Sequence, residues 1–204
     1  MKPDEIEALS FKIIEEETGS HAFSQDQWAI VRRMIHTSAD FEYLESVRFH
    51  PEAIQAGLKA IQNGKAIYTD TQMARSGINQ ERLKTFGVTV HCLIGDPRVV
   101  DRAKQNGITR AQAAVDLAGS ELDGCIYGVG NAPTALLQLI KMIKEKRLRP
   151  ALVVGLPVGF VNAAESKSAL MKLDIPFITN VGRKGGSNVA AAVVNALAIM
   201  AAEQ

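Results

Sequence analysis

The sequence predicts an α/β fold of three layers, α/β/α, with a mainly parallel sheet of about five strands and an N-terminal helical segment. Two observations predict this class. Short apolar runs alternate with helical stretches from residue 66 onward, as in chains built from strand–helix–strand crossovers. Glycine-rich polar loops also follow several of these runs, as ligand-binding loops do in open α/β sheets. The strands are expected at 66–69, 88–93, 125–129, 151–155 and 177–181.

The part of the chain before the first strand is predicted to be helical. Residues 4–18 and 25–36 have the spacing of amphipathic helices, and Pro51 opens a third helix that runs to about Asn63. A polar, partly aromatic segment lies between the second and third helices, and we assign it to neither a helix nor a strand.

Most of the predicted helices carry recognisable start signals. Side chains that accept or exchange hydrogen bonds with free backbone groups stand just before the apolar pattern begins. These signals are the capping boxes Ser24–Gln27 and Thr109–Gln112, Asp96 before Pro97, Asn131 as an N-cap with Pro133 in the first turn, and Asn162 with Glu165.

Composition limits the classes of partner. The 204 residues are 47% hydrophobic, enough for a sizeable core in one domain spanning 1–204. A net charge of +1 and an aromatic content of 5% argue against nucleic acid, which needs a basic face or stacking platforms. The longest apolar tract, 189–202, is too short and alanine-rich to span a bilayer. We therefore expect a cytoplasmic protein with no membrane or nucleic-acid partner.

Three glycine-rich loops are the main indication of a binding site. They cover residues 128–134, 155–162 and 182–187, and each follows a predicted strand. Because parallel strands end at a common edge, we expect the loops to gather there. Glycine lets backbone N–H groups approach an anionic ligand, and a helix N-terminus favours negative charge.

Conventional cofactor and metal motifs are not found in the sequence. Gly128-x-Gly130 lacks the third glycine of the dinucleotide fingerprint, and the loop at 182–187 has the wrong spacing for a P-loop. No histidine or cysteine cluster has zinc spacing, and Cys92 and Cys125 are interpreted as buried thiols. We predict no metal site and no cofactor.

His36 is the histidine that stands out. It ends the helix 25–36, and Arg33 lies three residues earlier on the same helical face. A guanidinium can bind a carboxylate bidentately while an imidazole exchanges a proton near neutral pH. The simpler alternative is a histidine that caps the helix C-terminus, where positive charge suits the helix dipole.

The ordered series of motifs along nearly the whole chain resembles the precorrin-8X methylmutase family, also called cobalt-precorrin-8 methylmutase. The motifs are Ser10-Phe-Lys-Ile-Ile14, Val31-Arg-Arg-Met-Ile-His36, Ile67-Tyr-Thr-Asp-Thr-Gln-Met73, Asp96-Pro-Arg98, Thr109-Arg110, Gly130-Asn-Ala-Pro-Thr-Ala135, Gly155-Leu-Pro-Val-Gly-Phe-Val-Asn-Ala-Ala-Glu-Ser-Lys167 and Gly182-Arg-x-Gly-Gly-Ser187.

The resemblance implies an isomerase of corrin biosynthesis that moves a methyl group from C-11 to C-12 of precorrin-8X or cobalt-precorrin-8, giving hydrogenobyrinate or cobyrinate. No methyl donor is needed, and cobalt, if present, arrives within the tetrapyrrole substrate. His36 matches the family's proton donor and acceptor, and Ser10 and Arg33 match substrate-contacting positions. The resemblance also implies a homodimer with its sites near the subunit interface.

Other residues suit the carboxylate fringe of such a substrate. Arg110 and Arg183 offer the same forked donors as Arg33, and Asn131 lies within the first glycine-rich loop. We therefore expect Arg110, Asn131 and Arg183 to bind substrate as well.

A different class of function remains open from the residues alone. A doubly wound protein could bind a small anionic ligand or nucleotide at the same loops without catalysis. A methyltransferase using S-adenosylmethionine is less favoured, because the glycine fingerprint and an acidic residue after a suitable strand are missing.

Overall fold

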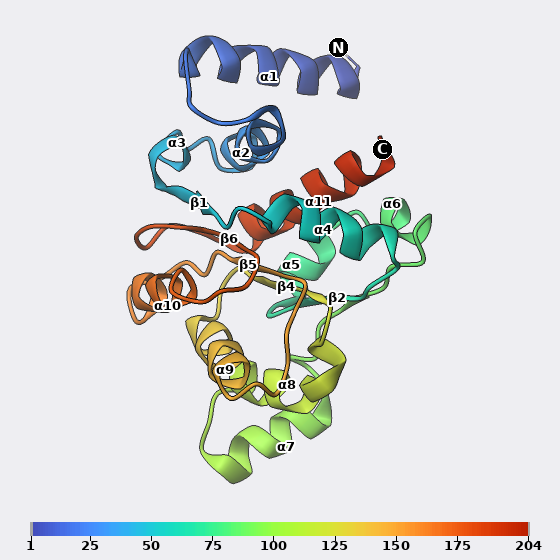
Figure 1. The fold of residues 1–204 in the computed structure, drawn as a ribbon, viewed down its shortest axis with the longest axis vertical. Helices are drawn as coiled ribbons and strands as arrows, with labels where there is room; N and C mark the ends of the chain where they lie inside the picture. Colours follow the sequence, from blue (N-terminus) through green and yellow to red (C-terminus); the bar gives the residue numbers. More distant parts are fainter. Residues whose placement is uncertain (1, 204) are drawn as a thin grey trace.

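A six-stranded sheet runs through the centre of the computed structural model, which describes residues 2–203 (Figure 1). The strand order is β1-β6-β5-β4-β2-β3, and every neighbouring pair is parallel except β1 with β6. The strands are β1 (Val47–Phe49), β2 (Ile67–Thr69), β3 (Val90–His91), β4 (Ile126–Val129), β5 (Leu152–Gly155) and β6 (Phe177–Asn180).

The five strands expected from the apolar runs are all present, so the predicted fold class is confirmed. The run at 88–93 is shorter than expected, because only Val90 and His91 pair with β2. The sequence reasoning missed β1, which lies in the polar segment after the second helix and pairs antiparallel with β6. Its three residues owe their strand conformation to that pairing rather than to a local apolar pattern.

The helices alternate with the strands after β2, as crossover connections require. They are α1 (Pro3–Thr18), α2 (Gln25–Ser38), α3 (Tyr43–Ser46), α4 (Ala53–Gln62), α5 (Gln72–Gly77), α6 (Gln80–Lys84), α7 (Pro97–Asn106), α8 (Arg110–Ala118), the 3₁₀ turn η1 (Gly119–Leu122), α9 (Pro133–Lys144), α10 (Ala163–Leu170) and α11 (Ser187–Ala202).

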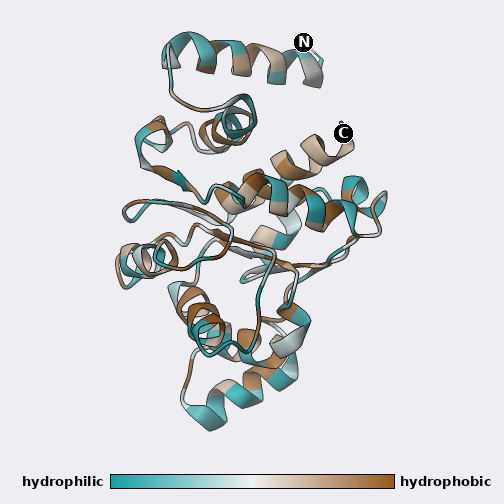
Figure 2. Ribbon diagram, in the orientation of Figure 1, coloured by the Kyte–Doolittle hydropathy of each residue, from teal (hydrophilic) through white to brown (hydrophobic). Residues whose placement is uncertain are grey.

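The two faces of the sheet are covered by different helices (Figure 1). Because side chains alternate along a strand, Leu152 and Val154 of β5 pack toward α4 and α11, whereas Val153 packs toward α9 and α10. Figure 2 shows the corresponding apolar colouring of α9 and α11. Helix α11 contains the tract 189–202 and is largely buried in this core. Within residues 2–203, no helix combines the length and apolarity needed to cross a membrane.

Helix α1 forms an outer layer that rests on α2 rather than on the sheet (Figure 1). Ile14 is buried against the core, and Phe11 packs partly against it. On its other side α1 exposes an apolar row, since Ile6, Leu9 and Ile13 are 51%, 44% and 44% exposed. The three residues share one helical face, which is therefore open to solvent in the single chain.

Two capping boxes are confirmed, and two other predicted start signals are wrong. Ser24 with Gln27 and Thr109 with Gln112 exchange the expected hydrogen bonds, and the side chain of Asp96 accepts from the Arg98 N–H. The N-cap of α9 is Ala132 instead of Asn131. Asn162 does occupy the N-cap of α10, but it is in the left-handed region at φ 61° and its side chain makes no capping bond.

The three glycine-rich loops gather at the carboxyl edge of the parallel strands, as predicted. The Val158 N–H donates to the carbonyl of Gly130 at 3.3 Å, and the Gly159 N–H donates to that of Arg183 at 3.1 Å. Gly186 donates to the Leu156 carbonyl at 2.9 Å. Backbone hydrogen bonds therefore join each loop to a neighbouring one.

The closeness of these loops makes one glycine indispensable. A Cβ atom on Gly130 would lie 2.5 Å from the Cα of Ser187, whereas one on Gly128 would lie 3.8 Å from its nearest neighbour, the Tyr68 carbonyl oxygen. We predict that Gly130→Ala lowers the free energy of unfolding by about 1–3 kcal/mol, the range for overpacking. Gly128→Ala is the matched control and is expected to be tolerated. Urea unfolding of both variants checks this, and equal stabilities would contradict the close contact.

Candidate active site

A buried carboxylate organises the centre of the carboxyl edge. Asp70 directly follows β2, and its side chain accepts three backbone hydrogen bonds from the loop before α9. Oδ1 accepts from Gly130 N–H at 2.9 Å, and Oδ2 accepts from the N–H groups of Asn131 and Ala132 at 2.8 and 2.6 Å. These amides were expected to bind an anionic ligand, but the protein's own carboxylate occupies them. That part of the prediction is wrong.

The sequence carried a signal for this arrangement. Asp70 is an acidic residue at the end of the apolar run of β2. The neighbouring strand, β4, is followed by a loop that leads into helix α9. Helix N-termini attract negative charge from within the protein as readily as from a ligand. Thr71 adds a second connection nearby, since its hydroxyl lies 2.8 Å from that of Ser187 at the start of α11.

His36 lies near the C-terminal end of α2 with its side chain exposed to solvent. The imidazole meets the ring of Phe11 edge to face, with the ring centroids 5.2 Å apart. It takes part in no hydrogen bond or ion pair with the described residues. The ring is thus oriented by an aromatic neighbour while its nitrogens remain available to a ligand.

Two surface hollows meet at His36. One, of about 330 Å³, lies between α1 and α2 and includes Ser10 and Phe41. The other, of about 230 Å³, lies between α2, α5 and α11 and includes Arg33 and Asn188. The structure therefore places Ser10 in one hollow and Arg33 in the other, and His36 lines both, although the three residues come from two helices.

Arg33 already has a carboxylate partner. Its Nη1 donates to Oε1 of Glu7 on α1 at 2.9 Å, and its guanidinium lies 5.1 Å from the centre of the Phe11 ring. Half of the Glu7 side chain is exposed, so water screens this pair and its stabilising effect is small. A ligand carboxylate can exchange with Glu7 at little cost.

The end of α2 is tied to the loops at the carboxyl edge. Asn188 donates from Nδ2 to the carbonyl of Thr37, the residue after His36, at 3.2 Å. Lys184 donates to Asp40 at 2.6 Å and lies 2.9 Å from Glu42. Its hydrogen bonds to these carboxylates raise the pKa of Lys184. These contacts join the segment that follows His36 to the third glycine-rich loop and to the first turn of α11.

The remaining predicted substrate residues lie elsewhere on this edge. Arg110 is exposed at the start of α8, next to Thr109, whose hydroxyl donates to that of Thr134 at 3.0 Å. Asn131 is exposed in the loop held by Asp70, and Arg183 is exposed with its guanidinium 5.6 Å from the centre of the Phe160 ring. None of the three lines either hollow at His36.

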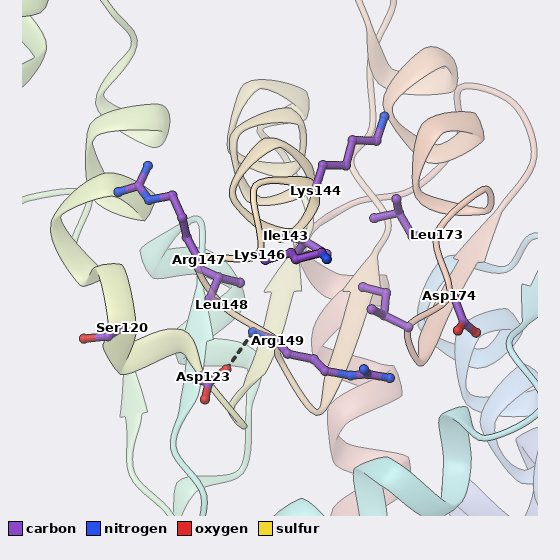
Figure 3. A pocket seen from close by; sticks show the side chains of 11 residues that line it. Ser120, Asp123, Ile143, Lys144, Lys146, Arg147, Leu148, Arg149, Leu173 and Asp174 are labelled. Carbon is purple, nitrogen blue, oxygen red and sulfur yellow. Dashed lines mark hydrogen bonds between the residues drawn. The ribbon is translucent and has the colours of Figure 1, made fainter.

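A larger hollow lies at the opposite edge of the sheet. Its volume is about 640 Å³, and residues just before β4, β5 and β6 line it (Figure 3). Its basic side chains do not converge, since Figure 3 shows Lys144, Arg147 and Arg149 pointing in different directions. This hollow contains none of the predicted site residues, and its scattered charges do not define an anion site.

The described residues contain neither a metal-binding group nor a reactive cysteine. Within residues 2–203 no group of three or more His, Cys, Asp or Glu side chains is placed to hold a metal ion. Cys125 is a buried free thiol, as expected, whereas Cys92 is free but only partly buried; burial raises the pKa of Cys125 to about 12. Such a thiol is a poor nucleophile, because the thiolate is the reactive form.

Fold and geometry together define an α/β protein with a candidate ligand site at the carboxyl edge of a mainly parallel sheet, beside an exposed histidine. A family model described as CbiC, precorrin-8X methylmutase, matches residues 5–200. The chain belongs to the precorrin-8X methylmutase family, and the resemblance seen in its motifs is confirmed.

Individual relatives agree with this assignment. A cobalt-precorrin-8 methylmutase of Priestia megaterium is 52% identical over 201 residues, which cover 98% of this chain and 89% of the relative. One from Leptospira interrogans is 45% identical over 207 residues, covering 98% and 94%. A solved structure of a precorrin-8x methyl mutase from Thermus thermophilus is 50% identical, with a TM-score of 0.90 over 97% of this chain and 98% of that chain. The comparisons support a methylmutase, an isomerase of cobalamin biosynthesis, rather than a non-catalytic nucleotide binder.

Proposed function

We propose that this chain moves a methyl group from C-11 to C-12 of precorrin-8X or cobalt-precorrin-8, with His36 as the proton donor and acceptor. The observation that carries the assignment is the exposed imidazole between two hollows, with Ser10 on one side and Arg33 on the other. Family membership supports the reaction, and the position of His36 supports its role.

The methyl shift is intramolecular, so the protein need not form a covalent bond to the substrate. The bond from C-11 to the methyl group breaks and that from C-12 forms, so no atom is gained or lost. His36 would donate a proton to the conjugated ring system and later take it back. Protonation would polarise the ring system while charge redistributes during the methyl shift. Arg33 and Ser10 would hold the ring so that the migrating methyl group faces its acceptor carbon.

We further propose that the natural substrate contains cobalt. Support comes from the two curated relatives described above, both of which are cobalt-precorrin-8 methylmutases. The cobalt would enter within the macrocycle as part of the substrate, and the chain itself would use no cofactor. Parallel assays with the cobalt-containing and metal-free substrates test this, with a higher kcat/KM expected for the former. A higher value for the metal-free substrate would contradict it.

We also propose a cytoplasmic homodimer, with the site near the interface. The hollows at His36 measure about 330 and 230 Å³, near or below the lower end of the usual ligand-pocket range of roughly 300–1,000 Å³. A large flat macrocycle would therefore need a further wall. The apolar row of Ile6, Leu9 and Ile13 lies on α1, the helix that forms part of this site. A second copy covering that row would supply such a wall.

Replacing His36 is expected to stop the chemistry without disturbing the fold. We predict that His36→Asn lowers the single-turnover rate by a factor of roughly 10²–10⁴, the range for a lost general acid, with substrate affinity nearly unchanged. His50→Asn is the control, because His50 lies at the other edge of the sheet, where its backbone N–H donates to the Phe177 carbonyl. A near-native rate in His36→Asn would show that another group supplies the proton.

Arg33 should contribute to binding more than to chemistry. We predict that Arg33→Ala weakens substrate affinity about 10- to 100-fold, as expected for a lost charge-assisted hydrogen bond, with a nearly native rate at saturation. Arg32→Ala is a close control, because Arg32 also lies over Phe11 and pairs with a glutamate of α1 but lines neither hollow. Unchanged affinity with a large loss of rate would contradict the anchoring role.

The oligomer can be tested on the apolar row itself. We predict that Leu9→Glu converts the dimer to a monomer, because it places a charge in the centre of the buried interface. Lys12→Glu, a charge reversal at an exposed position of the same helix, should leave the dimer intact. Sedimentation velocity measures both variants. A native protein that sediments as a monomer would overturn the dimer proposal.

A further inference from the structure

Lys167 is a lysine with no solvent exposure. It lies on α10 beneath the third glycine-rich loop, and its relative exposure is 0%. Its Nζ donates to Oδ1 of Asn180 at 3.0 Å and to the backbone carbonyl of Lys184 at 2.6 Å. Among the residues that the structure describes, no carboxylate makes an ion pair with this nitrogen. Both of its recorded acceptors are neutral.

Such burial works against the charged form of the side chain. Desolvation lowers the pKa of Lys167 from its ordinary 10.5 to about 8. A buried cation without a counter-charge destabilises the folded state, and an apolar side chain of similar length would fill the same space without that cost. Unlike an apolar side chain, the lysine makes directional hydrogen bonds, and these favour one position of the Asn180 side chain and of the Lys184 carbonyl.

The loop above Lys167 needs such an outside contact. Gly182 and Gly186 have φ values of 90° and 141°, which side-chain-bearing residues rarely adopt. Glycine-rich backbone has weak conformational preferences of its own, so neighbouring groups must select its path. The Lys184 carbonyl receives two such contacts, one from Lys167 and one from Nδ2 of Asn180 at 3.0 Å.

The same loop reaches the proposed site from its other side. The Lys184 side chain contacts Asp40 and Glu42, which follow α2, while its carbonyl is held from below by Lys167. Farther along, Asn188 bonds the carbonyl next to His36 and lines the hollow there. The position of this loop therefore determines where Arg183 stands, and the loop leads directly into the first turn of α11, which carries Asn188.

We propose that Lys167 is a positioning residue for substrate binding: by fixing the carbonyl of Lys184, it holds the loop 182–187, and with it Arg183 and the start of α11, in the position that faces a substrate extending from the hollow at His36. The inference rests on the proposed function for the identity of the substrate. Lys167 itself, being enclosed, touches no reacting atom.

The rate of trypsin cleavage within the loop measures how firmly its backbone is held. Arg183 and Lys184 are consecutive trypsin sites, and cleavage after either one requires the local backbone to leave its held conformation. We expect Lys167→Met to be cleaved at these bonds about tenfold faster than the native protein, as measured by mass spectrometry of the C-terminal fragment. The control is Ser166→Ala, a buried neighbour whose hydroxyl bonds the Ala163 carbonyl within α10. It should be cleaved at the native rate.

Kinetics then separate positioning from a purely structural role. For Lys167→Met we expect KM to rise about tenfold, with kcat within about twofold of native, because a displaced Arg183 would lose one charge-assisted hydrogen bond to the substrate. The melting temperature should change little, because removal of the desolvated cation offsets the loss of its hydrogen bond to the buried Asn180 side chain. Ser166→Ala should keep the native KM.

Each outcome has a defined meaning. Native-rate cleavage of Lys167→Met, or faster cleavage with an unchanged KM, overturns the inference. If Lys167→Met does not fold, Lys167→Gln carries the same test, and failure of both variants to fold shows that Lys167 is only structural. The cleavage assay uses no substrate. Faster loop cleavage in a protein whose native form lacks methylmutase activity would therefore refute the proposed function without refuting the hold on the loop.

Discussion

The carboxylate of Asp70 is the constraint on which the carboxyl edge depends. It follows β2 and accepts three backbone N–H groups at the start of α9, so one side chain joins neighbouring strands and determines where a helix begins. Gly130 must then approach Ser187 too closely for any Cβ atom. The packing of the other loops follows from this contact. An internal anion thus fills the helix N-terminus, and the site that we propose lies on the neighbouring surface at α2.

The elements that sequence reasoning predicted well are those with a strong local pattern. The apolar runs of β4, β5 and β6 are buried on both faces, and their sequence shows it. The missed β1 has no such pattern, because its pairing with β6 is a tertiary contact. The error at Asn131 has a similar origin. A cap by the residue's own side chain was expected, but Asp70, 61 positions away, supplies the acceptor.

In the candidate site, too, local sequence predicted some features, whereas others depend on tertiary packing. Helical spacing was enough to place Arg33 and His36 on one face, and the structure confirms that they share a hollow. Ser10 could be joined to them only through the family resemblance, because its place in a hollow with His36 depends on how α1 and α2 pack. The counter-charge on Arg33 was not foreseen either, since Glu7 lies 26 residues away. The burial of Lys167 has no local sequence signal, because it depends on how α10 packs beneath the loop at 182–187.

These observations describe a site in which rigid and exchangeable parts have separate roles. The sheet edge is fixed by buried hydrogen bonds, while Arg33 is paired with a half-exposed carboxylate that the proposed substrate would replace. The most direct test is a crystal structure of the His36→Asn protein with its unrearranged substrate. The macrocycle is predicted to lie against α2, with a ring carboxylate on Arg33 in place of Glu7. A macrocycle bound at the opposite edge, in the hollow lined by Lys144 and Arg149, would contradict the account.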